Sequence, residues 1–173
     1  MTGMTSQNQP TVTRPIMPDG YGVPETNEGA LPWSYAEQRL SESVNYWIGT
    51  ASQSGKPAVT PVWGVWMDGK LYFDGAPSTR RGRNIKENPR TVVHLEDGTK
   101  TVILEGRTTI LDSAPERGLA ERLAAAISAK YGKDGYSPKP DQWDEGGLFI
   151  FEPEMGMGWT EFPKDVTKWV FNK

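Results

Sequence analysis

The segment from Asp74 to Arg83 carries the side chains best suited to bind an anion. It reads Asp-Gly-Ala-Pro-Ser-Thr-Arg-Arg-Gly-Arg and joins an expected strand to an expected helix. The first backbone N–H groups of a helix lack intrahelical partners, and the helix dipole adds partial positive charge there. A phosphate at this point would also gain directed hydrogen bonds from hydroxyl and guanidinium groups. The candidates for this role are Ser78, Thr79, Arg80 and Arg81.

These residues also have a plainer interpretation. Arg80, Arg81, Arg83 and Lys86 could form the solvated face of a short helix with an ordinary Ser/Thr cap. The pattern by itself supports both interpretations about equally.

A second candidate is the strand formed by Val59, Thr60, Pro61, Val62 and Trp63. Pro61 has no backbone N–H, so this strand is expected at the edge of a sheet. Its free N–H and C=O groups could hydrogen-bond the edge of a planar heterocycle. The alternative, a plain edge strand, is the one that the pattern alone favours.

The chain has seven tryptophans, which would suit a pocket for flat ligands. Most of them are expected to be packing residues. Trp63 and Trp66 are the best candidates for ligand contact because they flank the strand described above. Their odd spacing places them on opposite faces of a strand, so at most one of them would line a pocket.

Composition excludes several other kinds of chemistry. The chain has no cysteine, which excludes disulfides, thiolate metal sites and a cysteine nucleophile. Its single histidine, His94, lies in an apolar strand pattern, where a histidine with a structural role is the commoner outcome. No metal site is expected. No catalytic side chain is assigned, and Tyr72 is a proton-donor candidate without geometric support.

The sequence as a whole is typical of one ordinary domain. It has 173 residues, of which 36% are hydrophobic and 24% charged. The net charge of −3 argues against a general nucleic-acid binder. No apolar run approaches the roughly 20 residues of a membrane helix, and the N-terminus lacks the features of a signal peptide. We therefore expect a cytoplasmic protein without a membrane span.

Residues 1–30 are expected to form a flexible or extended N-terminal arm, and residues 31–173 the folded domain. The arm is rich in proline, glycine and polar residues and shows no apolar period. It could cross a partner subunit or cover a site, or it could be a loose terminus, which is the commoner case.

Two hairpins dominate the expected strands. Residues 59–67 alternate, Asp68-Gly69 forms a two-residue turn, and residues 70–73 return. A second hairpin of the same form is expected from residues 92–95, a turn at Asp97-Gly98, and residues 102–111. Residues 148–151 and 169–171 are expected to add late strands.

Three helices are expected between these strands. The first begins at Ser34, where Ser34 and Glu37 match a capping box, and its apolar positions are Leu40, Val44 and Trp47. The second covers residues 79–88. The third opens at the Ser113-x-x-Glu116 box and ends at Gly132, before a Gly/Pro-rich loop over residues 132–147.

Several motifs, taken in order, resemble the pyridoxamine-phosphate-oxidase-like family of split β-barrels. The resemblance covers roughly residues 33–171 and is closest to the branch that uses the deazaflavin coenzyme F420. It implies a mainly β (α+β) fold, a split β-barrel of the FMN/F420-binding type with a few flanking helices. The motifs are residues 60–66, 70–73, 79–84, 88–89, 93–96, 104–106 and 167–169.

The resemblance also implies a cofactor site. Residues 59–63 match the strand whose backbone contacts the flavin ring, and Asp74 and Gly75 match positions that face the ring and the ribityl chain. Thr79, Arg80 and Arg81 match the phosphate-binding Ser-Arg-Lys of the family.

The match is less close at three positions. Trp63 stands where the oxidases have a lysine, which argues against pyridoxamine-phosphate oxidation, and Thr101 stands where they place a glutamine near the ring. Trp159 would reach the cofactor of a partner subunit, because family members are homodimers with sites at the interface.

The function implied is an F420H2-dependent oxidoreductase. It would transfer a hydride between the deazaflavin and a small unsaturated or electron-poor organic substrate, with the cofactor supplying the chemistry. Arg83 and Lys86 could bind the acidic tail of F420. The alternatives are an FMN-dependent reductase or oxidase, a non-catalytic protein that binds a flavin or a haem-like ligand, and a nucleic-acid-binding barrel.

Overall fold

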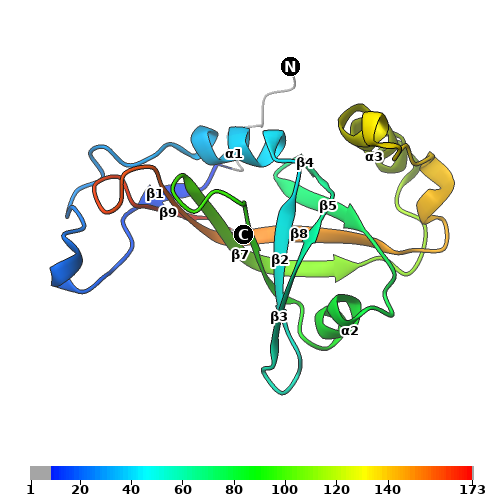
Figure 1. The fold of residues 1–173 in the computed structure, drawn as a ribbon, viewed down its shortest axis with the longest axis horizontal. Coiled ribbons are helices and arrows are strands. Elements are labelled where there is room, and N and C mark those ends of the chain that lie inside the picture. The colour runs from blue at the N-terminus through cyan, green and yellow to red at the C-terminus, as the bar shows by residue number, and fades with distance from the viewer. Residues whose placement is uncertain (1–8, 173) are drawn as a thin grey trace.

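The computed structural model describes residues 9–172 and has a largely antiparallel sheet that curls without closing (Figure 1). The path of paired strands is β1-β9-β8-β7-β6-β2-β3, and β5 joins it by pairing with both β8 and β4. This is the split β-barrel expected from the sequence. The strands are β1 (Thr11–Thr13), β2 (Tyr46–Ala51), β3 (Pro57–Val62), β4 (Val65–Met67), β5 (Lys70–Asp74), β6 (Arg90–His94), β7 (Thr101–Ile110), β8 (Leu148–Trp159) and β9 (Thr167–Val170).

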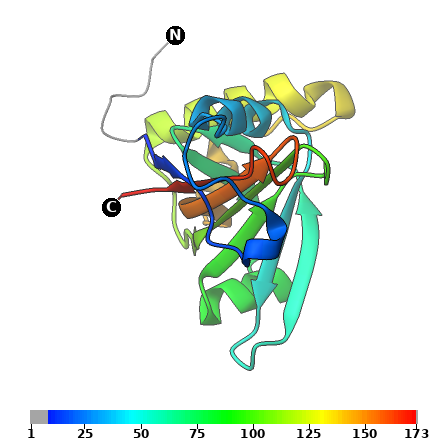
Figure 2. The ribbon, with the colours of Figure 1, turned by 90° about the vertical axis from the view of Figure 1, so that its left-hand side faces the viewer.

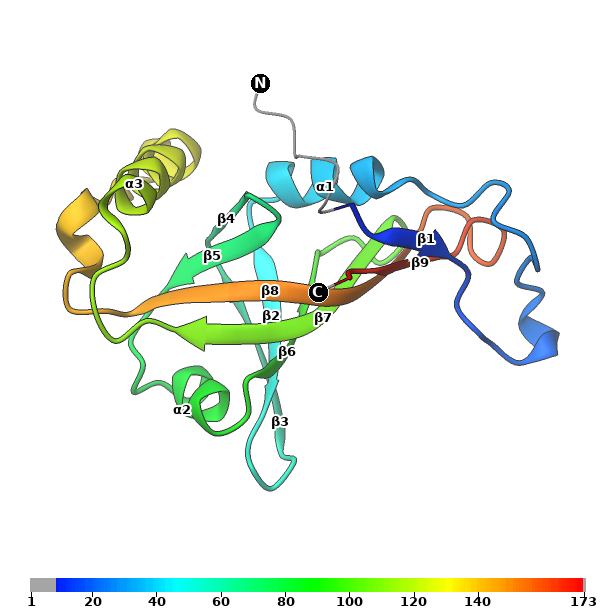
Figure 3. The same ribbon diagram turned by 180° about the vertical axis from the view of Figure 1, so that it is seen from behind.

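Helices lie above and below the curled sheet in the views of Figures 1 and 3. Helices α1 (Trp33–Glu42) and α3 (Arg117–Tyr131) lie above it in these views and α2 (Arg80–Glu87) lies below. Ile85 of α2 packs into the same core as α1. One apolar core joins α1 to the inner faces of the strands. A second core joins α3 to β4, β5 and the start of β8. Short 3-10 turns occur at Asp19–Tyr21, Gly132–Asp134 and Pro140–Trp143.

The long strand β8 connects the two halves of the sheet. It pairs with β7 along most of its length, with β5 near its start and with β9 near its end. Leu148, Phe149 and Phe151 are fully buried at its start, so this part of β8 contributes to both cores.

The first expected hairpin is confirmed and the second needs a correction. Asp68 and Gly69 both have positive φ, as a two-residue turn between β4 and β5 requires. The connection between β6 and β7 is longer, because the carboxylate of Asp97 accepts hydrogen bonds from the N–H groups of Thr99 and Lys100. This local turn replaces the tight Asp97-Gly98 turn that the sequence predicted.

Helix α2 has the expected position, while the starts of the other two helices differ. α1 begins after Pro32, without a side-chain cap, so the capping box of Ser34 and Glu37 does not form. α1 also ends at Glu42, which leaves Val44 exposed and places Trp47 in β2. At the start of α3 the cap is Glu116 itself, whose carboxylate accepts from the next free N–H groups, and Ser113 takes no part.

The expected strand over residues 59–67 is broken in two at Trp63 and Gly64. β3 pairs with β2, whereas β4 pairs with β5, so the chain changes partner at this point. Gly64 allows the close approach, because a Cβ atom there would lie 2.7 Å from the carbonyl oxygen of Tyr72. Side-chain alternation therefore does not run through from Val59 to Met67.

Part of the N-terminal arm packs on the domain. β1 pairs with β9, and the guanidinium of Arg14 donates to the carbonyls of Thr26, Glu28 and Val166. Residues 14–30 form a loop at the end of the sheet remote from α3 (Figures 1 and 2). The first eight residues of the expected arm lie outside the described residues. No helix among residues 9–172 is long and apolar enough to cross a membrane.

Candidate functional site

The start of α2 offers unpaired backbone N–H groups. Thr79 is the N-cap residue, and its side-chain oxygen accepts from the N–H of Gly82 at 3.1 Å. The N–H of Arg83 donates to the carbonyl of Thr79. Since the first turn of a helix has no intrahelical acceptors, the N–H groups of Arg80 and Arg81 are those that a bound anion could satisfy.

The three arginines of this segment point to different places. Arg80 donates to the carbonyl of Pro57 at 2.9 Å, at the start of β3. Arg83 turns back and donates to the carbonyl of Ser78. Arg81 donates to the hydroxyl of Thr60 at 3.0 Å. Only Arg81 among them extends along β3 toward Trp63.

Arg81 is a half-buried cation that makes no ion pair with a described residue. None of the ion pairs among the described residues includes it, and its buried Nε atom has no hydrogen-bond partner. Its guanidinium lies 5.7 Å from the ring centroid of Phe73 and 5.8 Å from that of Phe149. Burial lowers the pKa of Arg81 and nearby Asp74 raises it, but an arginine stays protonated in proteins.

A pocket of about 310 Å³ brings several expected residues together. Gly75 borders this region, and a Cβ atom there would lie 2.9 Å from the Nη2 atom of Arg81, so glycine leaves room for the guanidinium. The pocket thus joins the end of β3 to the segment before α2. Its lining residues are Pro61, Val62, Trp63, Asp74, Arg81 and Tyr136.

Trp63 presents an exposed aromatic face at this pocket. Its ring stacks on that of Tyr131 with a centroid distance of 4.7 Å and an interplanar angle of 8°, and it is still 40% exposed. Trp66 is only 8% exposed and packs against Trp33 in the core. Of the two tryptophans singled out from the sequence, only Trp63 lines the pocket.

β3 lies at the end of the path of paired strands, as Pro61 predicts. The carbonyl of Pro57 already points away from β2, because it accepts from Arg80. Backbone groups alternate along an antiparallel strand, so those of Val59 and the carbonyl of Pro61 point toward the same free edge. That edge leads to the pocket at Trp63.

The loop after α3 adds two residues that the sequence did not single out. The hydroxyl of Tyr136 donates to the carboxylate of Asp74, and the amide of Gln142 donates to the same oxygen at 2.9 Å. Burial, and then the hydrogen bond to Asp74, raise the pKa of Tyr136. These bonds fasten residues 136–142 over the pocket. Sequence reasoning marked the loop but had no signal for its contacts, since Tyr136 is 62 residues from Asp74.

Thr101 and Trp159 lie far from this pocket. They pair with each other at one end of β7 and β8. At the other end Ile110 pairs with Phe149, next to Leu148, the strand partner of Asp74. The nine steps along the strand from Thr101 to Ile110 correspond to about 30 Å. One chain therefore does not bring Thr101 or Trp159 to the residues around Arg81.

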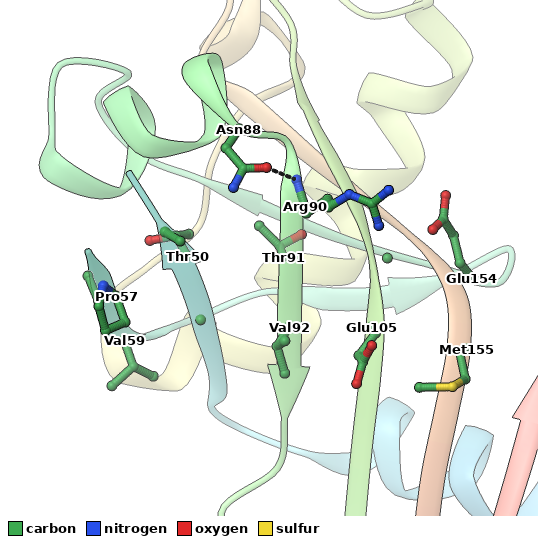
Figure 4. A pocket seen from close by; sticks show the side chains of 14 residues that line it. Thr50, Pro57, Val59, Asn88, Arg90, Thr91, Val92, Glu105, Glu154 and Met155 are labelled. Carbon is green, nitrogen blue, oxygen red and sulfur yellow. Dashed lines mark hydrogen bonds between the residues drawn. The ribbon is translucent and has the colours of Figure 1, made fainter. Parts of the chain in front are cut away.

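A larger hollow of about 720 Å³ lies on the outer face of the sheet (Figure 4). One cross-strand row runs through it from Val59 through Gly49, Val92 and Glu105 to Met155. Gly49 has no side chain, which deepens the middle of the row. Val59 and Val92 are 54% and 36% exposed, so the side chain of Val59 belongs to this face rather than to the pocket at Arg81.

His94 and Tyr72 are held by structural contacts. The ring of His94 stacks on Trp47, 6.1 Å between centroids, and its Nδ1 atom lies 2.9 Å from the carbonyl of Leu95. Tyr72 is buried in the second core, where desolvation raises its pKa. Neither residue lines the pocket at Arg81.

The fold is that of a split β-barrel protein with a few flanking helices. The chain belongs to the pyridoxamine 5'-phosphate oxidase family, whose model matches residues 35–147. This match confirms the resemblance found in the sequence. No curated protein matches the chain.

Solved structures with the same fold include proteins of different function. An F420 reductase is 20% identical with a TM-score of 0.54, and the match covers 69% of this chain and 94% of the other. An FAD-binding protein from Mesorhizobium loti is 19% identical with a TM-score of 0.57, covering 83% and 96%. The haem storage protein HutZ from Vibrio cholerae is 20% identical with a TM-score of 0.55, covering 70% and 89%. At these identities the likeness concerns the fold alone.

Proposed function

We propose that this protein is an oxidoreductase that binds coenzyme F420 at the pocket around Arg81 and reduces a small unsaturated or electron-poor organic substrate. The observation that carries the proposal is the environment of Arg81. A half-buried guanidinium with an unpartnered Nε atom and no ion pair among the described residues suits a phosphate, which accepts several hydrogen bonds.

The adjoining residues fit the rest of such a cofactor. The N–H groups at the start of α2 can add to the phosphate contacts, with Thr79 holding the turn in place. The free edge of β3 can bind the polar edge of a tricyclic ring, and the exposed face of Trp63 can cover part of that ring.

The chemistry comes from the cofactor, which when bound exchanges a hydride with the substrate. The chain's residues bind and orient it. Arg81 and the α2 amides fix the phosphate end, β3 fixes the ring edge, and residues 136–142 limit access of water from the side of Asp74.

F420 is preferred to FMN on two grounds. The sequence motifs resemble the F420 branch, and an F420 reductase is among the proteins with this fold. F420 also carries an acidic tail, and α2 presents Lys86 on its exposed side together with Arg83 and Arg80. Such a cluster would attract an acidic tail in a salt-dependent manner. An FMN-dependent enzyme is the alternative.

We further propose a homodimer whose interface includes the outer face around Val59 and Val92. The exposed apolar side chains and the hollow on this face support it. Within one chain Thr101 and Trp159 lie about 30 Å from the pocket at Arg81. In a dimer, Thr101 and Trp159 of one copy could lie near the cofactor bound at Arg81 of the other copy.

The test of cofactor binding is a fluorescence titration with F420 and, separately, with FMN. We expect Arg81→Ala to weaken binding of F420 by about tenfold to a hundredfold, as expected for losing hydrogen bonds from a charged group. Arg117→Ala is the matched control, because Arg117 is an exposed arginine at the start of α3. It should bind like the wild type.

Each result has a distinct meaning. Tight binding of FMN alone would leave the site in place and move the protein to the alternative cofactor. Binding of hemin alone would favour a ligand-binding protein over an enzyme. Binding of F420 that Arg81→Ala leaves unchanged would show that the phosphate site is wrong.

A further inference from the structure

The two last residues of α3 hold the backbone of Gly64, which follows Trp63. The N–H of Gly64 donates to the hydroxyl oxygen of Tyr131 at 2.9 Å. The carbonyl of Gly64 accepts from Lys130 Nζ at 3.0 Å and lies 2.8 Å from the Tyr131 hydroxyl. The polar backbone groups at the point where the chain leaves β3 are therefore bound by α3.

Lysine is an unusual residue type for position 130, which is partly buried at the end of α3. Its Nζ atom donates to the hydroxyl of Tyr46 at 2.8 Å and lies 4.8 Å from the centre of that ring. Tyr46 and Tyr131 are both fully buried, and no carboxylate of the described residues forms an ion pair with Lys130. Partial burial of an unpaired cation costs stability. A methionine would fill the space without that cost.

Tyr131 acts on Trp63 in two ways. Its hydroxyl binds the backbone immediately after Trp63, and its ring stacks on the indole. The other side of the indole belongs to the pocket that holds Arg81 and Tyr136. The position of the aromatic face in that pocket thus depends on the end of α3.

We propose that Lys130 and Tyr131 are positioning residues for the cofactor ring, because they hold Trp63 at the end of β3 with its exposed face in the pocket. The inference deepens the proposed function and rests on it. It assigns a role to α3, an element that shares no residue with the segments expected to contact the cofactor.

The titration of Lys130 should be observable in solution, because its ammonium group lies beside Tyr46 and Tyr131. Burial lowers the pKa of Lys130 to about 8. The charged or titratable groups that face it are Tyr46 and Tyr131, and burial raises the pKa of both, so they stay protonated between pH 7 and pH 9. Loss of the proton removes the cation from between the two rings. The surroundings of Trp63 should therefore change near pH 8.

The experiment uses the full chain and two readouts that do not need activity. The first is the near-ultraviolet circular dichroism of Trp63, obtained from pH 6.5 to 9.5 as the wild type minus Trp63→Phe. We expect a transition near pH 8 that Lys130→Met abolishes. Lys133→Met is the matched control, since Lys133 is an exposed lysine just beyond α3, and it should keep the transition.

The second readout is the dissociation constant of F420 and of FMN. Tyr131→Phe keeps the ring that stacks on Trp63 and removes the hydroxyl bound to Gly64. We expect it and Lys130→Met to weaken binding by about fivefold to tenfold, the size of one hydrogen bond. The affinity for inorganic phosphate should not change in either variant, because the phosphate contacts lie at Arg81.

Failure of the inference differs from failure of the proposed function. If the wild type binds neither F420 nor FMN, the proposed function is wrong, and with it the ring that these residues would position. If it binds one of them and both variants bind equally well, with no transition of the Trp63 signal near pH 8, the inference is overturned. If Lys130→Met does not fold, two measurements still test the inference. They are the pH transition of the Trp63 circular dichroism signal in the wild type and the cofactor affinity of Tyr131→Phe.

Discussion

Arg81 and Lys130 are half-buried cations without an ion-pair partner among residues 9–172, yet they differ in what the sequence reveals. Arg81 lies in a local motif between a strand and a helix, so its residue type and position made it a candidate for an anion site from the sequence alone. The partners of Lys130 are 84 and 66 residues away in Tyr46 and Gly64. Nothing in the periodicity of α3 indicates those contacts, and only the folded chain brings them together.

The lowered pKa of Lys130 predicts a pH dependence of stability. In the folded protein Lys130 loses its proton near pH 8, whereas an unfolded lysine titrates near pH 10.4. Between these values the unfolded chain binds more protons, so the free energy of unfolding rises with pH. Above pH 10 the trend reverses, because unfolded tyrosines ionise while Tyr46 and Tyr131 stay protonated in the fold.

Urea unfolding at pH 7, 8, 9 and 10 measures this effect. From pH 8 to pH 10 the wild type should gain about 1 to 2 kcal/mol relative to Lys130→Met, a value below the full shift because Lys130 is partly exposed. Parallel curves for the two proteins over this range would contradict the prediction.

At the scale of the elements, α2 has a side-chain cap at its N-terminus. Thr79 caps the helix by accepting from the N–H of Gly82. We expect Thr79→Ala to lower the free energy of unfolding by about 1 kcal/mol, as for other lost N-caps. Denaturant unfolding measures the change, and Ser78→Ala, one residue earlier, should cost less. An equal loss in both variants would mean that the cap contributes little.

Helix ends were predicted well where one local hydrogen bond decides them. Thr79 at the start of α2 is such a case. At α1 either Pro32 or Ser34 could precede the first turn. The helix begins directly after Pro32, so Ser34 lies inside it and does not cap it. The break at Trp63 and Gly64 could not be read from the alternation, because it depends on the carbonyl of Tyr72 on the paired strand and on Tyr131 of α3.

At the scale of the whole molecule, the outer face of the sheet predicts association. We expect Val92→Glu to place a charge in the hollow between β2, β6 and β7 and so to separate the proposed dimer into monomers. Sedimentation at several protein concentrations measures the mass. Val44→Glu is the matched control, because Val44 is 52% exposed after α1, away from this face.

A wild type that sediments as a monomer would remove the proposed interface. A dimer that survives Val92→Glu would place the interface elsewhere. In a monomer the pocket at Arg81 would have to function without Thr101 and Trp159, which the same chain holds at the far end of β7 and β8.

The family and the split barrel could both be predicted from local motifs in the right order, and both are confirmed, while the anion site at Arg81 stays a prediction. The sequence did not predict that the expected site residues fall into two distant groups, one around Arg81 and the other formed by Thr101 and Trp159. This division follows from the register of β7 with β8, in which Thr101 faces Trp159 and Ile110 faces Phe149. Register depends on pairing between segments about 50 residues apart, which a single sequence does not display.

The pairing of β1 with β9 has a consequence for biosynthesis. Thr11 can find its partner Val170 only after nearly the whole described chain has been made. At ordinary rates of translation the interval is on the order of 10 to 30 seconds. Until then β1 has no strand partner, so the nascent protein carries it unpaired on the ribosome.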